Sequence, residues 1–161
     1  MKLVIQRVKQ SKVEVGGKIV GEIGKGLLIF IGVEKEDSSR DIDYLIEKII
    51  HLRIFEDSNG KMNLCAFEVS AEFLVVSQFT LLGDCQKGRR PSFDRAADPA
   101  TGEVMYQRFV EQLKAQGVKK VATGQFRAMM DVSLVNDGPV TFVLESRLRH
   151  FYTNSESHSV G

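Results

Sequence analysis

Two apolar, β-branched runs flank the segment Asn136, Asp137, Gly138 and Pro139, and this arrangement limits how the C-terminal part of the chain can fold. Residues 132–135 form an alternating run, and residues 140–144 read Val-Thr-Phe-Val-Leu. Two such runs separated by turn-forming residues predict a strand, a tight turn and a strand. Gly138 tolerates backbone angles that other residues avoid, while Pro139 lacks an amide donor. Spacing alone favours a trans turn, because only about 5–6% of X-Pro bonds in folded proteins are cis.

A second informative segment, residues 77–81, reads Ser-Gln-Phe-Thr-Leu and directly follows the apolar run of residues 73–76. A polar group placed where a buried strand ends is a common location for a binding site in α/β proteins. We therefore expect Ser77, Gln78, Phe79 and Thr80 to lie at such a site.

Together these two segments resemble the signatures of the D-aminoacyl-tRNA deacylases, Ser-Gln-Phe-Thr-Leu and Asn-x-Gly-Pro-Val. Both are present without a mismatch, in the family's order and at about its spacing. Further likeness covers residues 1–8, 90–94 and 123–126. The resemblance implies a D-aminoacyl-tRNA deacylase domain over residues 1–147. The polar residues 148–161 lie beyond the family's usual end, and we expect a loosely held tail without chemistry there.

Bulk properties are those of one domain with a substantial core: 161 residues, 43% hydrophobic and 27% charged. Residues 1–8 have a strand pattern rather than that of a signal peptide, and no apolar run approaches the length of a membrane span. Cys65 and Cys85 are too few for a disulfide framework. We expect a cytoplasmic protein. A net charge of +1 means that any contact with nucleic acid must come from a local patch.

The N-terminal part of the chain reads as β structure. Residues 2–8 and 11–15 predict two strands, and Gly16 and Gly17 predict a hairpin into a strand over residues 18–23. Residues 27–31 are apolar on both faces, which is typical of a central strand. The strand that carries the first signature is expected over residues 72–79, a turn over residues 57–60, and a short strand over residues 118–122.

Two amphipathic helices are predicted. The first follows the capping residues 37–39, and the second begins at Pro99 and ends before Gly117. Their apolar stripes consist of Ile42, Leu45, Ile46, Ile49 and Ile50, and of Tyr106, Phe109, Val110 and Leu113. Together with the strands they predict a single α/β or α+β domain. The family resemblance implies a layered β/β/α sandwich with mixed sheets that forms a homodimer.

The side chains of the first signature lack a conventional catalytic partner. The hydroxyls of Ser77 and Thr80 need a base to become nucleophilic, yet His51, His150 and His158 all lie away from both signatures. A Ser-His-Asp triad is therefore poorly supported. The chain also lacks a zinc-ligand cluster, a Walker-type phosphate loop and a dinucleotide fingerprint. We expect neither a cofactor nor a metal.

The substrate that the resemblance implies, the 3′ acceptor end of an aminoacyl-tRNA, carries an activated ester beside a free ribose hydroxyl. Such a bond needs positioning and charge stabilisation more than it needs a strong base. We expect the backbone amides around Gln78, Phe79 and Thr80 to stabilise the oxyanion while the ribose hydroxyl helps to activate water. Thr80 either orients the ester or the water, or acts as the nucleophile.

Gly138 and Pro139 are expected to select the handedness of the amino acid. A cis bond between them would turn both carbonyls into the pocket, where they would exclude the Cβ of an L-residue. In the family this element comes from the partner subunit, which implies a homodimer with interlocking sites. The family also implies that Arg7 braces this element, although a lone arginine among apolar residues is commonly an exposed edge group. Asn136, within the second signature, is a further candidate for substrate binding.

Other residues have two interpretations. Phe126 and Met130 match pocket positions of the family, although their spacing also fits core residues. Within the long segment of residues 83–99, Lys87, Arg89 and Arg90 form either a solvated face or a set of phosphate contacts.

The chain departs from the family pattern in one place. The pattern after Thr123 is Gly-x-Phe-Gly-Ala-x-Met, whereas this chain has Arg127 before the alanine and Met129 in place of a usual acidic or polar residue. These departures concern the pocket rim and leave both signatures intact.

Three functions remain open. The first is hydrolysis of D-aminoacyl-tRNA, and of glycine attached to a wrong tRNA. The second is a module that binds tRNA ends without hydrolysis, and the third is an unrelated serine-type esterase. Intact residues 77–81 favour the first, and the missing histidine disfavours the third.

Overall fold

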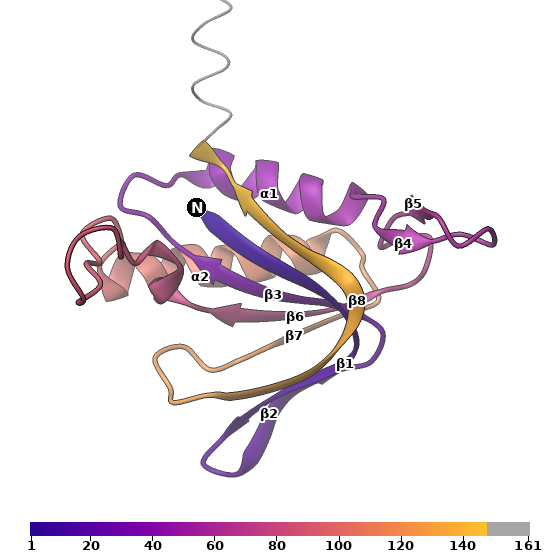
Figure 1. Cartoon of the computed structure of the whole chain (residues 1–161), viewed down its shortest axis with the longest axis horizontal. Helices are drawn as coiled ribbons and strands as arrows, with labels where there is room; N and C mark the ends of the chain where they lie inside the picture. Colours follow the sequence, from indigo (N-terminus) through magenta and orange to yellow (C-terminus); the bar gives the residue numbers. More distant parts are fainter. Residues whose placement is uncertain (148–161) are drawn as a thin grey trace, which may run out of the picture.

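The computed structural model describes residues 1–147 (Figure 1), so the expected tail of residues 148–161 lies outside the described residues. The strands are β1 (Lys2–Val15), β2 (Lys18–Ile23), β3 (Gly26–Gly32), β4 (Phe55–Glu56), β5 (Met62–Leu64), β6 (Glu72–Ser77), β7 (Lys120–Thr123) and β8 (Asp131–Glu145). The helices are α1 (Ser39–His51), α2 (Pro99–Ala115) and the short 3-10 helix η1 (Phe79–Leu82). No helix within residues 1–147 is long and apolar enough to cross a membrane.

A mixed six-stranded sheet forms the body of the domain, with strands in the order β2-β1-β3-β6-β7 and β8 added to β1. The pairs β3–β6 and β6–β7 are parallel, and every pairing of β1 is antiparallel. β3 lies in the interior of the sheet, which confirms the prediction of a central strand over residues 27–31. A separate two-stranded sheet, β4–β5, flanks the turn predicted over residues 57–60.

Successive side chains of the central strands point to opposite faces of the sheet, and each face carries its own apolar core. Leu27, Ile29 and Ile31 point to the face covered by α1 and α2, and Leu28 points to the opposite face. On that opposite face the sheet curls over, and a Cβ at Gly21 of β2 would overlap the carbonyl oxygen of Thr123 in β7. The second core therefore lies between β2 and the strands β6 and β7, while the helices cover the first (Figure 1).

Both helices begin and pack as their sequences predict. The amide of Ser38 donates to Asp41 Oδ2 over 2.8 Å at the start of α1, and Asp98 Oδ1 accepts from the amide of Thr101 over 3.0 Å at the start of α2. The apolar stripes predicted for both helices are buried, and Pro99 occupies the first turn of α2. These contacts confirm the two predicted amphipathic helices.

Several predicted strand boundaries are wrong. Residues 2–8 and 11–15 are not separate strands, because β1 runs unbroken through both. The strand of the first signature ends at Ser77, and Phe79 and Thr80 belong to η1. β7 begins at Lys120 rather than at residue 118.

The predicted strand, turn and strand around Gly138 is also wrong, because β8 is one continuous strand paired with β1 on both sides of this point. Val8 pairs with Asn136, and Gln6 pairs with Thr141. Residues 137–140 therefore face Arg7 alone, and the extra residues form a bulge.

Candidate active site

The first signature is held at the carboxyl end of β6. Ser77 pairs with Ile31 in the parallel ladder, and the amide of Gln78 donates to the Ile31 carbonyl over 2.8 Å. The chain then turns sharply through η1, and the amide of Gly83 closes the turn on the Thr80 carbonyl over 3.0 Å. The polar end of a buried strand is thus fixed by backbone hydrogen bonds on both sides.

Only some of the amides in this turn remain for a ligand. The amide of Gln78 is used by Ile31, and that of Leu81 donates to the Gln78 carbonyl over 3.2 Å. The amides of Phe79 and Thr80 are the first two of η1 and so have no acceptor within the helix. Of the three amides expected to stabilise an oxyanion, that of Gln78 is used by pairing with β3, whereas those of Phe79 and Thr80 have no acceptor within η1.

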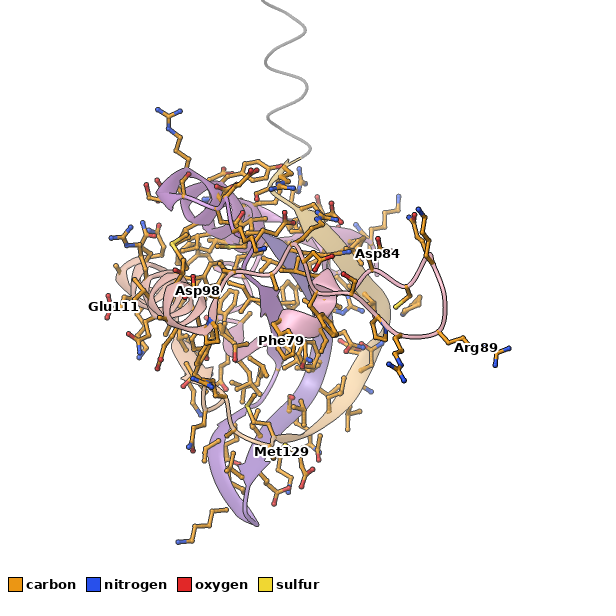
Figure 2. All side chains as sticks on the ribbon, turned by 90° about the vertical axis from the view of Figure 1, so that its left-hand side faces the viewer. Phe79, Asp84, Arg89, Asp98, Glu111 and Met129 are labelled. Carbon is orange, nitrogen blue, oxygen red and sulfur yellow. The ribbon has the colours of Figure 1, made fainter. Side chains whose placement is uncertain are left out.

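The side chains of the turn differ in exposure. Ser77 and Gln78 are half-buried, whereas Thr80 is exposed and the Phe79 side chain is 59% exposed. Gln78 Nε2 donates a close hydrogen bond to Thr80 Oγ1. The ring of Phe93 packs edge-on against Phe79 with centroids 5.1 Å apart. Figure 2 shows Phe79 in the centre of this face of the molecule.

Phe126 and Met130 lie beside the same strand end. The amide of Gly124 donates to the Val75 carbonyl over 3.1 Å, which ties the segment after β7 to β6. Met130 Sδ accepts from the amide of Gln125 over 3.4 Å, and the Phe126 ring lies 5.8 Å from that of Tyr106. Both side chains are half-buried and pack against the two cores. The core interpretation is therefore confirmed for both residues, and their place in the aminoacyl pocket stays a prediction.

Tyr106 of α2 contacts the backbone of β6 close to the first signature. Its hydroxyl donates to the Val75 carbonyl over 2.9 Å in a buried position. Burial raises the pKa of Tyr106 to about 12, an effect that a hydrogen bond with the Thr123 side chain opposes. The phenol is thus neutral and acts as a structural donor rather than as a catalytic base.

The second signature forms its own cluster at the β8 bulge. The Gly138-Pro139 peptide is cis, and Asn136, Gly138 and Pro139 are all exposed. Arg7 is 3% exposed, and its Nε donates to the Asp137 carbonyl over 3.1 Å. Arg7 Nη1 also donates to the Ile54 carbonyl over 2.7 Å. The edge-group interpretation of Arg7 is therefore wrong, because its cation is buried against the bulge.

The chain does not bring its two signatures together. The bulge lies opposite Arg7, which is level with Leu27 of β3, whereas Ser77 is level with Ile31. Four residues along a strand span about 13 Å and three strand spacings about 14 Å, so the bulge and Ser77 are roughly 20 Å apart. Within one chain, Gly138 and Pro139 cannot enter the site beside Thr80.

Within the part of the chain that the structure describes, no histidine lies at this strand end. His51 lies at the end of α1, near the Phe67 ring and beside a cavity of about 150 Å³ that Asp43 and Gln112 also line. No group of three histidine, cysteine or acidic side chains within residues 1–147 could hold a metal ion.

Two supporting residues were not predicted. Phe93 and Tyr106 contact the site from the loop after η1 and from α2. Phe93 belongs to residues 90–94, a segment whose likeness to the family offered a signal, whereas Tyr106 was assigned only to the core.

The two residues that depart from the family pattern, Arg127 and Met129, are both exposed. Arg127 has φ of 62°, and Met129 is 92% exposed.

The geometry can be compared with known proteins. The family described as D-Tyr-tRNA(Tyr) deacylase matches residues 4–145, which include both signatures. The chain belongs to this family. The match runs from β1 to the end of β8 and so covers every strand and both main helices.

Relatives in this family are similar over nearly their whole length. A D-aminoacyl-tRNA deacylase of Desulfatibacillum aliphaticivorans is 58% identical over 91% of this chain and 100% of its own. One of Thermosipho africanus is 57% identical over 91% of this chain and 98% of its own.

A solved structure described as c-Myc DNA Unwinding Element Binding Protein is also similar. It has a TM-score of 0.84 and 38% identity, over 90% of this chain and 98% of that chain. A probable eukaryotic D-amino acid tRNA deacylase shares the fold, with a TM-score of 0.77 and 19% identity over 89% of this chain and 97% of that chain.

Proposed function

We propose that this protein hydrolyses the ester bond of D-aminoacyl-tRNA, and of glycine attached to a wrong tRNA. The observation that carries the proposal is the intact Ser77–Leu81 segment, fixed at a strand end in a chain that matches deacylases along its length. Water attacks the ester carbonyl, and the bond to the ribose oxygen breaks. The amino acid leaves as a carboxylate, and the tRNA recovers its hydroxyl. The protein acts where charged tRNA occurs, in the cytoplasm.

In this proposal the protein contributes electrostatic stabilisation more than proton transfer. The amides of Phe79 and Thr80 would donate to the oxyanion that forms on the ester carbonyl. The free ribose hydroxyl of the substrate would assist the attacking water, which agrees with the absence of a histidine beside Ser77 among residues 1–147. Thr80 Oγ1, already hydrogen-bonded to Gln78, is assigned an orienting role. Phe126 and Met130 would form the wall of the aminoacyl pocket.

We further propose that Gly138 and Pro139 select handedness from the partner subunit of a homodimer. The separation of roughly 20 Å supports this arrangement, because the bulge can complete only a site on another chain. Both residues are exposed, and Arg7 holds the preceding Asp137 carbonyl over 3.1 Å. Fixed backbone carbonyls of this element would exclude an L-residue Cβ, and Asn136 would lie at the rim.

A rival function is the binding of nucleic-acid ends without hydrolysis. The observation that favours it is the 38% identity to a structure described as a DNA-unwinding-element binding protein. A pure binder, however, has no need for two donor amides beside an exposed threonine at a strand end. The serine-type esterase finds no comparable support, because the described histidine His51 is on α1.

One experiment separates these functions. Purified protein is incubated with D-aminoacyl-tRNA, L-aminoacyl-tRNA and uncharged tRNA, and the remaining ester is measured over time. Loss of the D-ester alone is expected. Retention of both esters with binding of all three RNAs would favour the rival, and equal loss of both esters would remove the proposed selectivity. Inhibition by a hydroxyl-directed reagent would indicate the serine-type esterase.

A further inference from the structure

The loop that follows η1 closes on itself and presents a compact basic tip. Asp84 and Ser92 exchange backbone hydrogen bonds of 2.7 and 2.9 Å, which join the two ends of the loop. Gly88 has φ of +72°, a value that allows the chain to reverse between Lys87 and Arg89. We call residues 87–90, which contain Lys87, Arg89 and Arg90, the basic tip.

The charges of the basic tip are not neutralised within residues 1–147. All three cations are exposed, and none forms an ion pair there. The neighbouring acids are engaged locally: Asp84 Oδ1 accepts from the Gln86 amide over 2.9 Å, and Asp94 Oδ2 accepts from Ser92 Oγ over 2.7 Å. In a chain of net charge +1, three free cations within four residues form a strong local concentration of positive charge.

The root of the loop is attached to the first signature. Gly83 donates to the Thr80 carbonyl over 3.0 Å, and the Phe93 ring packs on Phe79. In Figure 2, Phe79 lies at the centre of this face, Asp84 lies above and to its right, and Arg89 projects farther out on the same side. Gly88, in the middle of the tip, is four residues from both Asp84 and Ser92, so the backbone of the tip extends at most about 14 Å from the loop root.

We propose that the basic tip binds backbone phosphates next to the esterified 3′ end of the tRNA, while the ester lies at Phe79 and Thr80. This inference rests on the proposed function. Arginine and lysine are the residues that contact phosphate, and two arginines permit bidentate contacts. Since these contacts are to the backbone, they position every tRNA alike and carry no preference for the amino acid.

The test compares a charge-reversed tip, K87E/R89E/R90E, with wild type. We expect at least tenfold weaker binding of uncharged tRNA by the variant. The slope of log affinity against log salt should fall by about 2, because about 0.7 is lost for each phosphate contact to a single strand. With D-aminoacyl-tRNA, KM should rise at least tenfold while kcat changes less than twofold. With a D-aminoacyl-adenosine, which lacks phosphates, the two proteins should perform alike.

A matched control reverses the same number of charges elsewhere. Lys61, Arg108 and Lys114 are exposed cations without an ion pair within the described part of the chain, and K61E/R108E/K114E should bind tRNA within twofold of wild type. Equal tRNA binding by wild type and the tip variant would overturn the inference and leave the proposed function intact. If wild type failed to hydrolyse the ester but the tip variant still bound tRNA more weakly, the proposed function would fail and the basic tip would stand.

Discussion

Arg7 Nε lies 3.1 Å from the carbonyl oxygen of Asp137 and 3.2 Å from Oδ2 of the same residue, so a buried cation on β1 fixes the bulge of β8. The second Arg7 anchor, the Ile54 carbonyl, lies just before β4. The bulge is thus attached to a part of the molecule distant in sequence. This attachment, together with the burial of Val140 in the main core, gives the exposed Gly138 and Pro139 a defined position.

Arg7→Ala should loosen the bulge and destabilise the fold. Loss of the buried cation leaves the Asp137 carboxylate and two carbonyls unpaired, and we expect a cost of about 2–3 kcal/mol in the free energy of unfolding. Urea denaturation measures this cost. The ratio of D- to L-ester hydrolysis should also fall. Arg7→Lys keeps the charge but lacks the planar fork, so it should be intermediate in both measurements. An unchanged ratio in a folded Arg7→Ala protein would contradict the bracing role.

Gly138→Ala should lower the rate of hydrolysis without changing the stability of the fold. A Cβ at Gly138 meets only the Asn136 side-chain nitrogen, at 3.2 Å, so the melting temperature should change by less than about 2 °C. Hydrolysis should nonetheless drop sharply, because the methyl group would project into the site of the partner. Gly26→Ala is the contrasting variant, since its Cβ would overlap the Glu72 carbonyl oxygen and should prevent stable folding. Full activity of Gly138→Ala would argue against entry of this element into a site.

Substitutions at Thr80 test the assigned chemistry. Thr80→Ala should retain most single-turnover hydrolysis of D-aminoacyl-tRNA, because the hydroxyl only orients. Thr80→Pro removes the backbone amide at a position where proline is tolerated, and the rate should fall about 10²–10³-fold. Circular dichroism controls for folding. Complete inactivation of Thr80→Ala, together with a trapped ester on the wild-type protein, would instead establish Thr80 as the nucleophile.

Arg127→Gly should stabilise the protein. Arg127 has φ of 62°, a left-handed conformation that costs a residue with a Cβ about 1–2 kcal/mol and that glycine adopts freely. We expect the melting temperature to rise by about 3 °C, measured by thermal denaturation. Ala128→Gly is the control, because Ala128 has no positive φ and should lose stability. A fall in stability of Arg127→Gly would mean that the arginine side chain contributes more than its backbone costs.

Tyr106 should make the protein sensitive to alkali. Its pKa is raised to about 12 in the folded state from 10.0, so the neutral phenol stabilises the fold fully below pH 10. That contribution is lost as the pH rises from about 10 to about 12, since the unfolded chain ionises first. Tyr106→Phe should therefore show a shallower loss of stability over this range, although it starts lower without the hydrogen bond to Val75. Parallel stability curves for both proteins would exclude this role.

The periodicity of apolar residues correctly predicted the helices and the central strand. The stripe from Ile42 to Ile50 needs one helical face buried, and the structure buries it under the sheet. Residues 27–31 are apolar on both faces, which only an interior strand between two layers can satisfy. Both features follow from periodicity and burial without reference to distant residues.

The wrong predictions all depended on pairing between distant segments. Asn136 to Pro139 has the composition of a turn, and only the continuous partner strand β1 makes it a bulge. The amide of Gln78 resembles its neighbours in sequence, yet the parallel register with Ile31 removes it from the site. Similarly, no local signal shows that the two signatures lie roughly 20 Å apart in one sheet.

The distance between the two signatures has a consequence for genetics as well as for structure. In the dimer that we propose, a chain carrying Thr80→Pro and a chain carrying Gly138→Ala are each inactive alone, but their mixed dimer contains one intact site. Random exchange of equal amounts should therefore restore about a quarter of the wild-type sites, whereas sites formed within a single chain would restore none. Two defective alleles of this protein would thus rescue one another in the same cell.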